Sequence, residues 1–199
     1  MNDKFTTKSE KKEPYTIVYF DVMKDLHISY MEYIVLQTML HFSSKNEYKK
    51  GISKISNHLK LSRNTIYKYL KILMLKEHIA RFEPKSDTYY LKYDIKERFE
   101  NGGKLYVKIY HNHRKELKIA IKKYALLYMI YSLSKNLKNR CANAGIKNYC
   151  NYINISESHF ETVKGQLIKV NLLEQQTTTF LKLNENLFNW FENNKSVQE

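Results

Sequence analysis

The residues best suited to binding chemistry in this sequence follow Ser62. Serine is a preferred helix N-cap, and the apolar residues Ile66, Leu70 and Leu73 recur after it at helical spacing, so a helix is expected to begin here. At about 100° per residue, the side opposite this apolar stripe is polar and cationic and holds no acid. It carries Arg63, Asn64, Tyr67, Lys68 and Lys71, with Ser62 and Thr65 at the helix start.

These side chains can contact phosphates and the edges of bases. Arginine makes two-pronged contacts with guanine or phosphate, asparagine can pair with adenine, and lysine neutralises phosphate. The alternative is the solvated face of an ordinary amphipathic helix, which most charge-rich arcs are. Three cations without an acid favour the first interpretation, in which residues 62–71 contact a nucleic acid.

The charge of the whole chain also indicates an anionic partner. The 199 residues include 34 Lys and Arg against 20 Asp and Glu, a formal net charge of +14. Charge of one sign repels itself, so a large anionic partner is expected to offset it. The excess is concentrated in residues 101–150, where Lys115, Lys118 and Lys122 follow an i, i+3, i+7 spacing. We expect a helical stripe there that contacts phosphate non-specifically, with a solvated face as the alternative.

The elements expected to position residues 62–71 are three helices and a hairpin. Ser29 and Glu32 have the spacing of a capping box, which predicts a helix over 29–42. Further helices are expected over 53–60 and from Ser62, followed by strands over 79–82 and 88–93. Only 5 Gly and 2 Pro are present, which disfavours an all-β sandwich, so the fold expected is mainly α with small β-hairpins.

The second half of the sequence repeats the first. A shift of 91 residues pairs Leu26 with Leu117, and a shift of 94 pairs Ser62 with Ser156, along with other apolar positions. The two shifts differ by three, which indicates one short insertion in a loop.

Two tandem domains are therefore expected, joined by a linker at the glycine pair of residues 101–103. Domain 1 covers 15–100 and domain 2 covers 104–192, after a flexible tail over 1–14. In domain 2, the helix equivalent to the one at Ser62 is expected to begin at Ser156. Its corresponding arc carries two acids and no cation: Glu157, Ser158, Glu161, Thr162 and Gly165. Phosphates would repel this arc, so we expect it to pack against protein or to be held away from a groove.

Residues 52–70, ISKISNHLKLSRNTIYKYL, resemble the helix-turn-helix of winged-helix DNA-binding domains. Such domains occur in GntR-like and MarR-like regulators and at the N-termini of some phage and plasmid replication proteins, and the resemblance covers about 15–93. Ser56 fills the small-residue position of the motif, whereas Lys60 stands where glycine is usual. The resemblance implies two tandem winged helix-turn-helix domains, the first placing the helix at Ser62 in a major groove. It also implies a backbone or minor-groove contact by Lys85 and Ser86, with a plain surface turn as the alternative.

The function expected is sequence-specific binding of double-stranded DNA by domain 1, in a transcriptional regulator whose domain 2 adds charge and assembly surface. A plasmid or phage replication initiator is the close alternative, and an adaptor that uses winged helices to grip protein is the alternative of another class. Phosphate loops, nucleophile elbows and His-Glu-x-x-His motifs are absent from the sequence, so neither an enzyme nor a cofactor is expected.

Cysteine and histidine spacing predicts neither a disulfide nor a metal site. Cys141 and Cys150 are expected to be free thiols, and with His111, His113 and His159 they lack zinc-site spacing. No run of about 18 apolar residues exists, so we expect no membrane association and a cytoplasmic, nucleoid-associated location. The segment 187–191 is expected to close the second core, with a homo-oligomer contact as the alternative.

Overall fold

The computed structural model describes residues 15–84, 86–103, 106–153, 155–177 and 179–194. The expected flexible tail over 1–14 and the hairpin residue Lys85 lie outside these ranges. Helices make up 57% of the described residues, and the strands form small antiparallel sheets. The fold is therefore mixed α/β, and the expectation of a mainly α fold is only roughly right.

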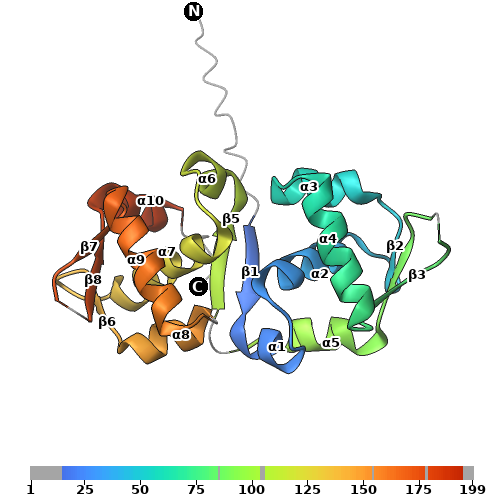
Figure 1. Cartoon of the computed structure of the whole chain (residues 1–199), viewed down its shortest axis with the longest axis horizontal. Helices are drawn as coiled ribbons and strands as arrows, with labels where there is room; N and C mark the ends of the chain where they lie inside the picture. Colours follow the sequence, from blue (N-terminus) through green and yellow to red (C-terminus); the bar gives the residue numbers. More distant parts are fainter. Residues whose placement is uncertain (1–14, 85, 104–105, 154, 178, 195–199) are drawn as a thin grey trace, which may run out of the picture.

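The first half of the chain, which we call repeat 1, contains the expected helices and hairpin together with short flanking elements (Figure 1). In chain order its elements are β1 (Tyr15–Tyr19), α1 (Phe20–Asp25), α2 (Tyr30–Phe42), β2 (Glu47–Tyr48), α3 (Ile52–Leu59), α4 (Arg63–Leu75), β3 (Ile79–Arg81), β4 (Tyr89–Leu91) and α5 (Tyr93–Asn101).

The second half, repeat 2, contains the same kinds of element in the same order. They are β5 (Tyr106–Tyr110), α6 (His111–Glu116), α7 (Ile121–Ser134), β6 (Cys141–Asn143), α8 (Ile146–Ile153), α9 (Glu157–Lys169), β7 (Leu173–Gln175), β8 (Phe180–Leu183) and α10 (Glu185–Asn193). α7 begins 91 residues after α2, and α9 begins 94 residues after α4, which are the two shifts found in the sequence. Left-handed backbone also recurs at equivalent positions, at His27 and Lys118 and at Glu77 and Asn171.

The two repeats are joined by an antiparallel ladder of β1 with β5 at the centre of the molecule (Figure 1). Tyr15 lies opposite Tyr110, and Tyr19 lies opposite Tyr106. The shift of 91 maps Tyr15 onto Tyr106 and Tyr19 onto Tyr110, so the ladder maps onto itself. The repeats are therefore related by an approximate two-fold axis that passes through this ladder.

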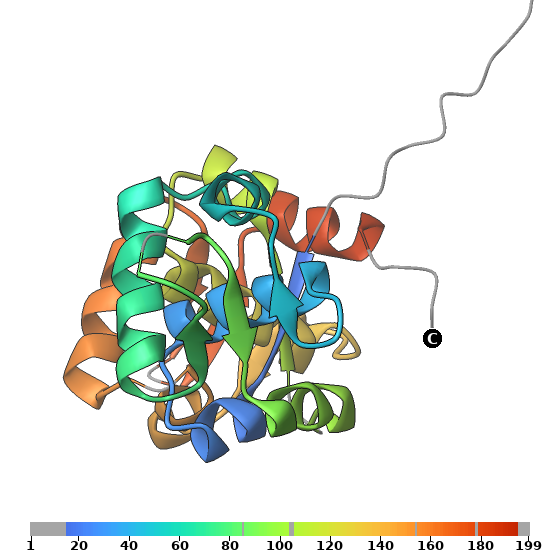
Figure 2. The same cartoon turned by 90° about the vertical axis from the view of Figure 1, so that its right-hand side faces the viewer.

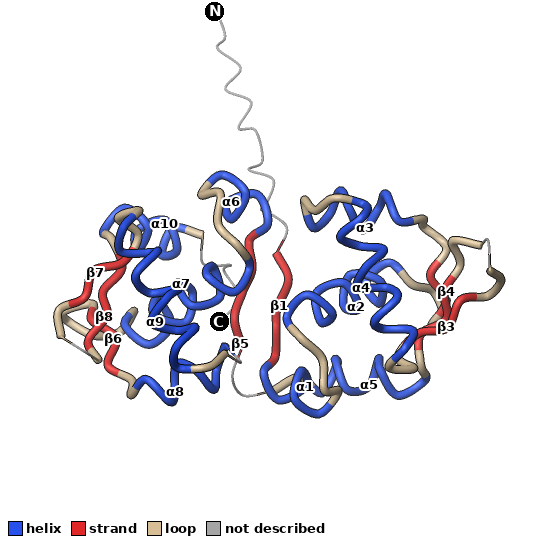
Figure 3. The backbone as a smooth tube through the Cα atoms, viewed as in Figure 1, coloured by secondary structure: helices blue, strands red, loops and turns tan. Residues whose placement is uncertain are grey.

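Each repeat also has a three-stranded antiparallel sheet, in the order β2-β4-β3 or β6-β8-β7. Figure 3 shows these two sheets at opposite ends of the molecule, with the helices between them and the central ladder. Val18, Val107 and Ile109 of the ladder are fully buried, and they belong to one hydrophobic core that continues through both repeats. The two repeats thus share a core rather than folding around two separate ones.

Equivalent ring contacts lie at the two ends of the interface between the repeats. Phe20 of α1 packs on Tyr152 of α8, with ring centroids 5.9 Å apart. At the equivalent place His111 of α6 lies 5.6 Å from His58 of α3, and the His111 Nε2 atom lies 2.7 Å from the Thr16 hydroxyl. The contact at one end of the interface therefore joins phenylalanine to tyrosine, and the equivalent contact at the other end joins two histidines.

The buried imidazole of His111 makes stability depend on pH. Burial lowers its pKa from the usual 6.5 to about 3 in the folded chain. Between these two values the unfolded chain takes up a proton that the folded chain does not. The stabilising contribution of the neutral ring is therefore complete above about pH 6.5 and is lost as the pH falls toward 3.

We expect His111→Phe, which places there the residue that repeat 1 has at this position, to reduce this pH dependence. In urea titrations below about pH 6, the unfolding free energy of the variant should fall with decreasing pH less steeply than that of the parent chain. The two slopes should differ by about 1.4 kcal/mol per pH unit. His159→Gln, which removes an exposed imidazole instead, is the matched control variant. An equal slope in His111→Phe and the parent chain would contradict the assignment to His111.

Candidate nucleic-acid interface

The helix predicted to begin at Ser62 is α4, and its start is capped as expected. The Ser62 hydroxyl accepts a hydrogen bond from the Thr65 backbone N–H at 3.2 Å. Ile66, Leu70 and Leu73 are buried, as their spacing predicts, and they fix the rotation of the helix about its axis. The opposite side of α4 consequently faces away from the core.

That opposite side is open to solvent. We call its exposed residues the α4 edge: Ser62, Arg63, Asn64, Tyr67, Lys68 and Lys71. Thr65 is half-buried beside them. Among the residues that the structure describes, no acid forms an ion pair with Arg63, Lys68 or Lys71. The edge therefore presents three uncompensated cations next to the polar groups of a helix start.

The turn that leads into α4 depends on a left-handed residue. Lys60 has φ 53° and ψ 44°, the conformation in which glycine is favoured. The Ser56 hydroxyl donates to the Leu61 carbonyl at 2.6 Å, so this small residue supports the turn directly. Lysine adopts this conformation at a steric cost that glycine would avoid.

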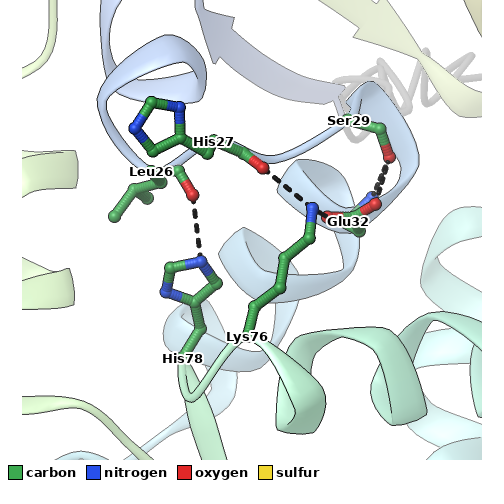
Figure 4. Close-up of polar contacts among 6 residues, drawn as sticks. All are labelled: Leu26, His27, Ser29, Glu32, Lys76 and His78. Atoms are coloured by element: carbon green, nitrogen blue, oxygen red, sulfur yellow. Dashed lines mark hydrogen bonds and ion pairs between the residues drawn. The ribbon is translucent and has the colours of Figure 1, made fainter.

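A polar network holds the C-terminal end of α4 against the start of α2 (Figure 4). Lys76 donates to the His27 carbonyl at 2.8 Å and forms an ion pair with Glu32 at 2.5 Å. Glu32 is buried, and it also accepts a hydrogen bond from the Ser29 hydroxyl at 2.8 Å. Lys76 carries no signal of its own in the sequence; the available signal is Glu32, an acid in an apolar helix that needs a cationic partner.

The hairpin between β3 and β4 lies beyond α4 at the end of repeat 1 (Figure 1). Ser86 is half-buried, and its hydroxyl accepts a hydrogen bond from the Thr88 N–H within the turn at 3.0 Å. Arg81, which the sequence analysis did not select, donates to the Pro84 carbonyl and to the Tyr89 hydroxyl. The polar groups of these two residues thus take part in building the turn.

The expected stripe of Lys115, Lys118 and Lys122 does not lie on one helix. Lys115 belongs to α6 and Lys122 to α7, whereas Lys118 lies between them with a left-handed backbone, φ 53°. Helical spacing cannot align the three side chains because the chain leaves the helix at that point. The prediction of a single stripe is wrong, although Lys115 and Lys118 are exposed. The neighbouring Arg114 is buried and donates to the Leu59 carbonyl at 3.2 Å.

The equivalent helix of repeat 2, α9, lies on the same face of the molecule as α4 (Figures 1 and 2). Its polar arc contains Glu157, Ser158, Glu161 and Thr162, all exposed, so no other part of the described chain covers it. Lys164 is buried and pairs with Glu161 at 2.6 Å. The two repeats therefore present edges of opposite charge on one face.

Both cysteines and His113 are buried in the core. Cys141 and Cys150 are free and buried. His113 stacks on Trp190, with centroids 3.4 Å apart, so the C-terminal segment closes the core of repeat 2 as expected. Across the described ranges, no three His, Cys, Asp or Glu side chains gather closely enough to hold a metal ion. Within the same ranges no helix is both long and apolar enough to cross a membrane.

Comparisons with known proteins give no family. No protein-family model matches the sequence, and no curated protein matches it. The mRNA-binding domain of elongation factor SelB from E. coli, solved in complex with SECIS RNA, is 7% identical, covers 79% of this chain and 100% of that chain, and has a TM-score of 0.26. The DIP2311 protein from Corynebacterium diphtheriae is 11% identical over 84% of this chain and 28% of that chain, with a TM-score of 0.28. Neither score supports an argument about fold or function.

Replacing the left-handed residue before α4 should stabilise the chain. We expect Lys60→Gly to raise the unfolding free energy by about 1 kcal/mol, because glycine adopts this backbone without the steric penalty of a Cβ atom. Urea unfolding monitored by circular dichroism measures the change. Lys60→Ala keeps the Cβ atom and should give no gain, so equal stabilisation by both variants would show that charge removal is the cause.

Breaking the network at the end of α4 should destabilise the chain. Lys76→Met leaves the buried Glu32 without its cation and is expected to lower the unfolding free energy by about 2 kcal/mol. Adding Glu32→Gln should recover part of this loss, because a neutral amide then replaces the unpaired carboxylate. Additive effects of the two changes in a double-mutant cycle would refute the coupling.

Proposed function

We propose that this chain binds double-stranded DNA with sequence dependence and acts as a transcriptional regulator on the nucleoid in the cytoplasm. In this proposal the repeats are two tandem winged-helix domains, 15–100 and 104–192, and the α4 edge enters a major groove. The order of helices and hairpin in each repeat and the helix-turn-helix pattern of residues 52–70 support it.

The observation that carries the proposal is the exposure of the α4 edge. A solvated helix face usually mixes signs of charge, whereas this edge holds Arg63, Lys68 and Lys71 without an acidic partner among the described residues. The positive end of the helix dipole lies at the same end as Arg63, which further favours an anion there. Within the described ranges, no other segment covers these exposed side chains.

The positions along α4 indicate a division of roles. Arg63 and Asn64 lie in the first turn, where this kind of helix contacts base edges. Lys68 and Lys71 lie one and two turns further on, at a distance suited to the phosphates that border the groove. The acids of α9 would be repelled by a second groove, so one chain is proposed to read one half-site despite its approximate two-fold axis.

Arg63→Ala and Lys68→Ala are each expected to weaken duplex binding by about 1 to 3 kcal/mol. Arg63→Ala should also relax the sequence preference, because only a base contact carries sequence information. The measurement is fluorescence anisotropy with a duplex selected from a random library. Lys96→Ala removes a cation from α5, away from the α4 face (Figure 2), and should change the affinity little. Unchanged affinity in a folded Arg63→Ala/Lys68→Ala chain would reject the α4 edge as the reader.

The salt dependence of binding separates this proposal from a protein adaptor. A chain that neutralises several phosphates should lose orders of magnitude in affinity between about 50 and 200 mM salt. A flat salt dependence would favour the adaptor. A footprint over one promoter-overlapping site would favour the regulator, and an array of repeated sites at an origin would favour a replication initiator.

A further inference from the structure

The two repeats differ sharply at one place outside the α4 edge, the start of their longest helices. In repeat 1, Ser29 caps α2 and Glu32 pairs with Lys76 (Figure 4). The shifts of 91 and 94 place Ala120, Lys123 and Val170 at the three equivalent positions. Repeat 2 has therefore lost the cap, and it has a cation where repeat 1 has the buried acid.

The start of α7 is consequently electropositive. Ala120 provides no side-chain cap, so the first amide groups of α7 lack the acceptor that Ser29 supplies in repeat 1. Lys122 and Lys123 follow, half-buried, and neither is paired with an acid in the part of the chain that the structure describes. Two ammonium groups beside a helix N-terminus favour an anion.

These groups line a pocket of about 360 Å³ between the starts of α2 and α7 and the side of α9. Its walls are mainly apolar and include Tyr30, Met31, Ile121 and Val163, and none of the described residues that line it is an acid. The volume falls within the range of small-molecule sites, which combine apolar walls with a few polar groups. Because Tyr30 and Met31 belong to repeat 1, the pocket lies where the two repeats meet.

Two small residues of α9 leave room for this pocket. Thr162 and Val163 line it, whereas repeat 1 has Lys68 and Tyr69 at the equivalent positions. The Lys68 ammonium lies 5.7 Å from the Tyr69 ring centroid, so in repeat 1 these longer side chains pack against each other. The cavity and the positive charge therefore arise from separate substitutions that coincide at one place.

We propose that this pocket binds a small organic anion whose apolar body fills the cavity and whose carboxylate lies at Lys122, Lys123 and the start of α7. The apolar walls disfavour a fully hydrated inorganic ion, and the two lysines disfavour an uncharged or cationic ligand. This pocket does not include the α4 edge, so the proposal of an anion site can be tested separately from the proposed function.

The test compares two fluorescent probes that share an aromatic body. Anilinonaphthalene sulfonate carries an anion, which stands in for the carboxylate, and phenylnaphthylamine is its uncharged analogue. The folded chain should bind the sulfonate saturably with one site per chain, and the amine about ten-fold more weakly. Equal affinity for both probes would overturn the assignment of an anion site.

Ala120→Ser/Lys123→Glu restores the capping box of repeat 1. Because Val170 stands where repeat 1 has Lys76, the new carboxylate gains no equivalent cation, so circular dichroism first establishes that the variant is folded. Its sulfonate affinity should fall by about ten-fold or more, while its amine affinity stays unchanged. Lys147→Glu makes the same charge change at an exposed site on α8 and should bind the sulfonate like the parent chain. Val163→Tyr, which introduces the residue of repeat 1, should reduce binding of both probes.

Unchanged sulfonate affinity in Ala120→Ser/Lys123→Glu, or an equal loss in Lys147→Glu, would overturn the proposal. So would a loss of affinity for duplex DNA in Ala120→Ser/Lys123→Glu without a loss of sulfonate affinity, since the lysines would then be phosphate contacts.

Discussion

The antiparallel ladder of β1 and β5 determines how the rest of the chain is arranged. Its register is symmetric between the repeats, and its buried valine and isoleucine side chains merge the two halves into one core. Any element built outward from β1 is therefore repeated, turned by about half a rotation, outward from β5. For this reason α4 and α9 lie on the same face of the molecule (Figures 1 and 2).

Within this arrangement the two repeats have similar residues at core positions. They have different residues at positions that face solvent or the interface between the repeats. Ile66 and Phe160 are both buried at equivalent places, because a core position needs apolar volume. Arg63 and Glu157 are both exposed at equivalent places, where the fold tolerates either charge. The same divergence gives Glu32 in one helix and Lys123 in the other. In our two proposals, repeat 1 binds a polyanion along α4, and a small anion binds at the start of α7 in repeat 2.

The local elements around the candidate site were predictable, and the long-range contacts were not. Helical periodicity and serine caps predicted α2, α3, α4 and the β3–β4 hairpin to within a few residues, because those signals lie within one segment. The helix α5 was missed because only Ile95 and Phe99 mark its buried side. The β1–β5 ladder joins residues nearly a hundred positions apart, and the left-handed Lys118 that breaks the lysine stripe is not marked by a glycine. The pocket beside α7 requires three helices to be placed together.

The proposed function requires that the exposed edge of α4 contacts a DNA duplex. The most direct measurement is backbone amide chemical-shift mapping of the whole chain with and without a selected duplex. We expect the largest changes on residues 62–71 and little change on the acidic arc of α9, residues 157–165. Saturable duplex binding with no change along residues 62–71 would contradict the proposed function.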